Sequence, residues 1–151
     1  MAEFTYNPIQ LVGAGAPVIL NTRIGCNRGY VLHRNESGIV TLRGAVNNPY
    51  ACFARYNVEF NGNIAIPEGE TVGPIAVAIA IDGEPLQISR AIVTPAAVDN
   101  YFNVTCVATI DVPRGCCNSI SVENVLATDV AGTAQIPINV QNATLRVSRT
   151  A

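Results

Sequence analysis

The chain has 151 residues, of which 49% are hydrophobic and only 13% are charged. This length fits one domain with a single core, and no apolar run approaches the roughly 20 residues that a membrane-spanning helix needs. The net charge of -2 and the scattered Arg residues argue against a nucleic-acid partner, which would require a basic stripe. A surface with so few charged residues favours self-association.

The first 17 residues contain two features that disfavour regular structure, Asn7-Pro8 and the run from Gly13 to Pro17. We expect residues 1–17 to form a flexible N-terminal arm, and residues 18–151 to form the folded domain. The opening MAEFTYNPIQ lacks a positively charged region followed by an apolar core, so it does not read as a secretory signal.

Short segments with strand composition follow the arm, and no helical pattern separates them. They lie at about 18–24, 29–34, 39–44, 52–61, 75–82, 86–93, 100–112, 118–125 and 136–149. Eight to nine strands without helices predict an all-β sandwich or barrel.

The clearest pattern lies between Tyr56 and Val93. Tyr56, Val58 and Phe60 alternate with polar residues, as in a half-buried strand that ends at Asn61-Gly62. Asp82-Gly83 has the residues that a two-residue type I′ turn requires, because both tolerate a positive φ. The sequence therefore predicts a hairpin that joins strands 75–82 and 86–93.

The strand at 75–82 is apolar on both faces. Bulky Ile and Val side chains occupy one face, and Ala76, Ala78 and Ala80 occupy the other. A solvated face would carry polar residues, so something must cover these alanines. Either a loop of the same chain covers them, or they form an interface with another subunit.

Five cysteines do not form an even set, and none belongs to a C-x-x-C pair. Cys106 shares a strand face with apolar residues, which predicts a small buried hydrophobe. The other four cysteines are Cys26, Cys52, Cys116 and Cys117. They are either reduced thiols that pack within the fold or, if the protein matures outside the cell, partners in one disulfide. In that case Cys116 or Cys117 would bridge to Cys26 or Cys52.

No constellation in the sequence indicates catalysis. The single histidine, His33, has no second histidine and no cysteine at ligand spacing, so one chain is not expected to hold a metal ion. G-x-S-x-G and phosphate-binding glycine motifs are absent. Arg55 and Glu59 fall on one face of a strand and could join an ion-pair ladder. We expect no enzyme, cofactor or metal.

Three segments carry a family resemblance: GNIAIPEGETVGPIAVAIAIDGEP, IVTPAAVDNYFNVTCVATIDVPRGCCNSISVEN and INVQNATLRVSR. They resemble the compact antiparallel jelly rolls of the tumour-necrosis-factor (TNF) and C1q-like superfamily. They are most similar to versions found in gut Firmicutes and their phages and prophages, and more distantly to the C-terminal domains of collagen-like spore-surface proteins. The resemblance covers roughly residues 18–151.

The resemblance implies a homotrimer, since those families form tight trimers with subunits side by side about a threefold axis. It favours Ala76, Ala78 and Ala80 as interface residues. Without a Gly-X-Y stalk or a signal peptide, the sequence favours a phage virion protein assembled in the bacterial cytoplasm, a capsid decoration or head-fibre module. The N-terminal arm would then bind a capsid or other particle protein.

Two other functions remain open. The first is a carbohydrate- or receptor-binding tip domain, for which Tyr30, Tyr50 and Tyr101 are the only aromatic candidates to contact a surface glycan. The second is a structural protein of the spore surface.

Overall fold

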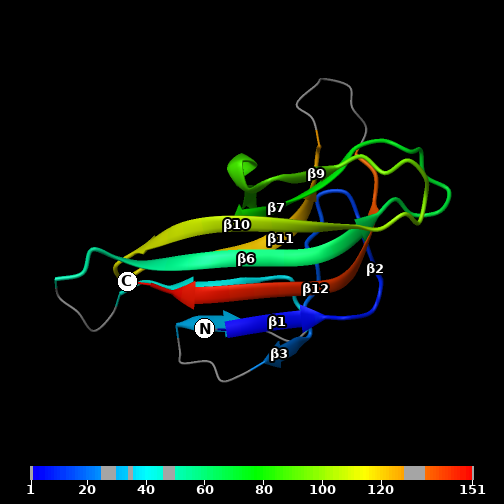
Figure 1. Cartoon of the computed structure of the whole chain (residues 1–151). Coiled ribbons are helices and arrows are strands. Elements are labelled where there is room, and N and C mark those ends of the chain that lie inside the picture. The colour runs from blue at the N-terminus through cyan, green and yellow to red at the C-terminus, as the bar shows by residue number, and fades with distance from the viewer. Residues whose placement is uncertain (1, 25–29, 34–35, 46–49, 128–134, 151) are drawn as a thin grey trace.

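The computed structural model describes residues 2–24, 30–33, 36–45, 50–127 and 135–150. These residues form two six-stranded antiparallel sheets that pack face to face, with no α-helix among them (Figure 1). The all-β expectation is confirmed.

Sheet A contains both ends of the described chain. Its strand order is β10-β6-β12-β1-β3, and β2 pairs with β12 beside this path. Its members are β1 (Ala2–Tyr6), β2 (Gln10–Val12), β3 (Thr22–Ile24), β6 (Phe53–Ala65), β10 (Phe102–Pro113) and β12 (Ile138–Arg149). The long strands β6, β10 and β12 alternate buried and exposed residues, as expected of strands with one face on the core.

Sheet B has the order β4-β5-β11-β7-β8, and β9 also pairs with β7. Its members are β4 (Val31–His33), β5 (Val40–Arg43), β7 (Ile75–Ile81), β8 (Glu84–Pro85), β9 (Ala91–Val93) and β11 (Cys117–Val125). The main core lies between the two sheets. Its largest fully buried side chains include Phe4, Leu42, Tyr56, Phe60 and Ile79.

The expectation of an N-terminal arm without strands is wrong. β1 pairs with β12 from Ala2↔Val147 to Tyr6↔Ala143, and β2 extends the pairing with β12. Phe4 is fully buried in the main core. The alternation of Ala2 and Phe4 with polar residues was too short to predict a strand next to Asn7-Pro8. In the structure, the backbone of this segment is hydrogen-bonded to β12.

Two strand boundaries also differ from expectation. β6 does not end at Asn61-Gly62 but continues to Ala65, because β10 and β12 pair with it on both sides of this point. The segment 86–93 is broken by a 3-10 helix, η1 (Gln87–Ser89). Ser89 holds it: its hydroxyl accepts a hydrogen bond from Ile79 N at 2.9 Å and donates one to Leu86 O at 2.7 Å.

The predicted turn at Asp82-Gly83 is confirmed. Both residues have positive φ, 52° and 84°, as a type I′ turn requires. The Asp82 carboxylate also accepts a hydrogen bond from Ser119 N at 2.8 Å, which ties the turn to the start of β11.

Candidate functional site

The exposed face of sheet A, here called the open face, is built from rows of side chains that cross five strands. One row contains, in register from β3 to β10, Ile24, Glu3, Arg146, Glu59 and Val107. We call this the charged row. It has alternating charges in its middle and an exposed apolar side chain at each end.

The neighbouring row of the open face carries uncharged polar groups. It contains, in register, Thr22, Thr5, Thr144, Asn61 and Thr105. The Asn61 amide donates to Thr105 Oγ1 at 2.9 Å and exchanges hydrogen bonds with the Asn103 amide. These bonds between strands hold the polar side chains in place.

Ion pairs on the open face join neighbouring strands. Arg55 binds Asp111 through two hydrogen bonds of 2.8 and 3.0 Å, and this bond lowers the pKa of the Asp111 carboxyl. Arg146 Nε lies 3.7 Å from Glu3 Oε1. Arg55 therefore pairs with Asp111 on β10. Glu59, which was expected to join the same ion-pair ladder, has no ion-pair partner among the described residues.

A shallow polar depression interrupts the middle of the open face. Glu3, Glu59, Asn61, Thr144 and Arg146 line its volume of about 240 Å³. Two carboxylates with one guanidinium leave it acidic, but it contains neither a nucleophile nor a histidine.

The 3-10 helix η1 lies beside β10, at the edge of sheet A (Figure 1). Side chains of η1, β6 and β10 form a mainly apolar groove there. We call it the edge groove. Its volume is about 640 Å³, and Asn57, Val58, Glu59, Leu86, Ile88, Val107, Ala108 and Thr109 line it. Ile88 is 94% exposed and Val107 is 63% exposed. Exposed aliphatic side chains that gather in one groove are typical of a surface that another molecule covers.

Sequence reasoning missed the edge groove. One signal was present, because Val107 falls in the polar register of β10, between Thr105 and Thr109. Ile88 had no such signal, since its exposure depends on the 3-10 turn that interrupts the predicted strand.

Ala76, Ala78 and Ala80 lie on β7, and all three are fully buried within the single chain. Ala76 and Ala78 form a small cluster with Val125, against which Ala127 packs, apart from the main core. Neighbouring parts of the chain therefore leave these methyl groups no exposed surface. Their place in a subunit interface remains a prediction.

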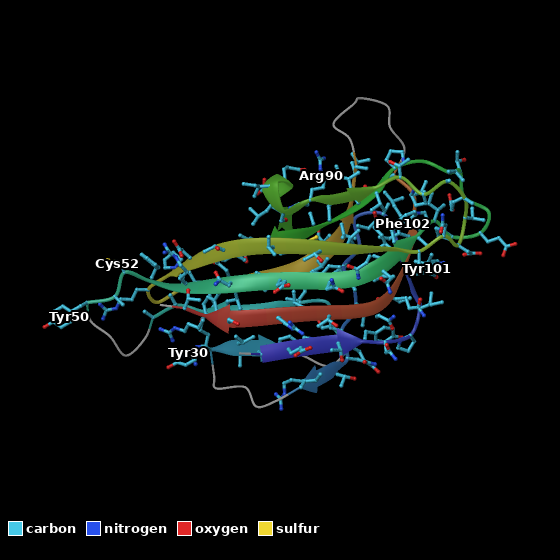
Figure 2. The ribbon with its side chains drawn as sticks, viewed as in Figure 1. Tyr30, Tyr50, Cys52, Arg90, Tyr101 and Phe102 are labelled. Atoms are coloured by element: carbon cyan, nitrogen blue, oxygen red, sulfur yellow. The ribbon has the colours of Figure 1, made fainter. Side chains whose placement is uncertain are left out.

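The thiols of Cys52, Cys116 and Cys117 are free, exposed and gathered at one end of the sandwich, whereas Cys26 lies outside the described residues. Cys52 O accepts a hydrogen bond from Arg114 N at 3.0 Å, two residues before Cys116. Figure 2 shows Cys52 at this end, close to Tyr50. A disulfide within this group remains a prediction.

Cys106, by contrast, lies in the core as expected, and burial raises the pKa of its thiol to about 11. At pH 8 only about one Cys106 in a thousand is then the reactive thiolate. We expect a thiol reagent to label Cys52, Cys116 and Cys117 rapidly in the native protein and Cys106 only after unfolding. Mass spectrometry of the labelled peptides would measure this, and equal labelling rates at Cys106 and Cys117 would contradict the burial.

The three tyrosines do not form one surface. Tyr50 is 93% exposed and precedes β6, whereas Tyr101 precedes β10. Because β6 and β10 are antiparallel, these positions lie at opposite ends of the sheet, as Figure 2 shows. Tyr30 is partly buried, and the Arg149 guanidinium lies 4.2 Å from its ring centre. Any glycan contact could use at most part of this set.

His33 has partners within the chain. Its Nε2 lies 2.9 Å from Ser37 O, and its ring packs on Phe4 with 4.7 Å between ring centres. In the described residues, no three His, Cys, Asp or Glu side chains are placed to hold a metal ion. The same part of the chain has no helix that is long and apolar enough to cross a membrane.

No protein-family model and no curated protein sequence matches this chain. Solved structures do. The globular domain of a zebrafish complement 1qA protein matches with a TM-score of 0.62 and 11% identity, covering 99% of this chain and 97% of that one. The Eiger TNF of S. frugiperda matches with a TM-score of 0.62 and 11% identity, covering 100% and 92%.

Both likenesses span nearly the whole of each chain, so they include β1 and β2 as well as the strands that sequence reasoning found. At this identity they establish architecture rather than activity. The chain has the jelly-roll fold of the TNF and C1q-like domains.

Proposed function

We propose that this chain is a non-enzymatic, trimeric jelly-roll module of a phage particle, where it decorates the capsid or forms part of a head fibre. The edge groove carries the proposal, because a groove that gathers the exposed side chains of Ile88 and Val107 is typical of a surface that a protein partner covers. The fold and the sequence resemblance to phage and prophage proteins support the same role.

Attachment to the particle must use the folded domain in this proposal. Residues 2–12 are committed to sheet A through their pairing with β12, so they cannot serve as a free arm without unfolding an edge of the sandwich. The surfaces available to a particle protein are the exposed ends and faces of the jelly roll.

The first test is the mass of the purified protein by light scattering after size exclusion, in reducing and non-reducing buffer. We expect three times the 15.9 kDa of one chain in both buffers. A monomer would contradict the trimer, and a trimer only in non-reducing buffer would mean that disulfides, rather than packing, join the subunits.

The second test is location. An antibody against the protein should label purified phage particles from the host culture. Labelling of purified spores, with none on phage particles, would select the spore-surface alternative. A signal on a glycan array would favour the carbohydrate-binding alternative.

A further inference from the structure

We propose that a pocket between β3 and β4 binds a small molecule through its oxyanion group, a carboxylate, sulfate or phosphate, and that Arg23 and His33 hold this group. Asn21, Thr22, Arg23 and His33 line the pocket, whose volume is about 560 Å³. We call it the lateral pocket. Binding of this kind requires neither the edge groove nor a second copy of the chain.

The two sheets bring Arg23 and His33 together. β3 is the last strand in the order of sheet A and β4 is the first in that of sheet B, so the lateral pocket lies at the edge of both sheets. Arg23 is opposite Phe4 in the register of β3 with β1, so its side chain and that of buried Phe4 lie on the same face of sheet A. The His33 ring packs on the same Phe4, with 4.7 Å between ring centres.

The lining of the lateral pocket is cationic and contains no carboxylate. Arg23 is exposed, and its guanidinium has no ion pair or hydrogen bond in the described part of the chain. A planar guanidinium presents two parallel N–H groups that match two oxygens of one oxyanion. The depression on the open face differs, because Glu3 and Glu59 line it and would repel an anion.

His33 and Asn21 add donors to the lateral pocket. Ser37 O accepts the hydrogen bond from His33, so Nε2 carries the hydrogen and Nδ1 is the nitrogen that gains the second proton. Protonation therefore gives His33 a positive charge and a new N–H donor. Asn21 Oδ1 accepts a hydrogen bond from Thr22 Oγ1 at 3.3 Å, which leaves the amide N–H groups of Asn21 for a ligand.

Oxyanion binding should depend on pH through His33. The other titratable groups on the elements packed against His33 are Glu3, Tyr6, Glu36 and Arg43. None of these four lines the lateral pocket, so Arg23 is the charged group that shares it with His33. Two neighbouring cations repel each other, and an anion held by both removes that repulsion. Oxyanion binding and protonation of His33 therefore strengthen each other.

The test uses the full chain and its single histidine. The imidazole signals of an NMR spectrum belong to His33 alone, so they report directly on the lateral pocket. Sulfate and glucuronate are the probes, because both keep their charge between about pH 6 and pH 8, the range in which histidine ordinarily titrates. We expect both to shift the His33 signals and to bind more tightly at the lower pH. Chloride at equal ionic strength and uncharged glucose should not shift them.

Two variants and one control assign the effect to residues. Arg23→Gln should weaken binding by about tenfold or more, the loss expected for charge-assisted hydrogen bonds. His33→Gln should remove the pH dependence, followed through the backbone amides of residues 21–24. Arg146→Gln makes the same change of charge on the open face, outside the lateral pocket, and should bind as the wild type does. Circular dichroism would verify that each variant folds.

Three outcomes would overturn the inference: no shift with either probe, equal affinity in Arg23→Gln and the wild type, or an equal loss in Arg146→Gln, which would mean attraction by net charge alone. Binding of only one probe supports the site and identifies the oxyanion that it accepts. If His33→Gln does not fold, a pH titration of the wild type decides. Sulfate should move the midpoint of the His33 titration to higher pH, and an unchanged midpoint would reject the role of His33.

Discussion

Phe4→Ala is expected to lower the free energy of unfolding by about 3–5 kcal/mol, the range for truncating a buried aromatic side chain. Phe4 is 0% exposed, lies in the main core and packs on the His33 ring. It is the largest buried side chain of β1, so its removal leaves a cavity and weakens the contact between sheet A and β4. Urea unfolding at fixed protein concentration would measure the loss.

Thr5→Ala is the matched control, because Thr5 is the next residue of β1 and lies on the open face. Its truncation should change the unfolding free energy by less than about 1 kcal/mol. Equal, small effects of the two substitutions would mean that residues 2–6 do not contribute to the core and that the N-terminal segment is an arm after all.

Asn124→Ala is expected to cost about 3 kcal/mol, because it removes the donor for three backbone carbonyl groups. Asn124 is buried on β11, and its amide nitrogen donates to Val12 O at 3.2 Å, Gly13 O at 3.3 Å and Ile136 O at 2.8 Å. These bonds fasten the end of β2, the residue after it and the segment before β12 to sheet B. Without the amide, the carbonyls of Val12, which is buried, and Ile136 lose this donor, whereas Gly13 O keeps its hydrogen bond from Ala16 N.

Asn118→Ala on the same strand should cost less than about 1 kcal/mol, since Asn118 is only partly buried. Hydrogen exchange provides a second measurement. The Gly15 and Val18 amides, which donate to Asn124 O and Val122 O, should exchange faster in Asn124→Ala than in the wild type. A loss of stability without faster exchange at these two amides would show that the amide supports some other part of the fold.

The sequence predicted the elements whose signals are local. Strict alternation from Tyr56 to Phe60 marked β6, and both apolar faces of residues 75–81 marked a strand that is covered on each side. Asp82-Gly83 indicated the turn, and the position of Cys106 on the apolar face of its strand indicated its burial. Each signal depends only on a residue and its near neighbours in the chain, so no knowledge of the partner strand was needed.

The candidate site was less accessible to sequence reasoning. Ala76, Ala78 and Ala80 were correctly expected to be covered, but the sequence could not distinguish the same chain from another subunit as the cover. The three tyrosines were candidates only as aromatic residues, and the antiparallel arrangement of β6 and β10 separates Tyr50 from Tyr101. The edge groove arises because η1 is fastened to β7 through Ser89 and lies beside β10.

By itself, the sequence determined an all-β domain, the positions of most strands and one hairpin turn, because period-two burial and turn preferences act over a few residues. Only the tertiary structure decided that residues 2–12 join sheet A, that β6 continues past Gly62, and that Ile24 and Val107 lie at opposite ends of one row. The physical reason is the same in each case. A strand's hydrogen-bond partners come from segments far away in the sequence, and β12, which accepts β1, begins more than 130 residues after it.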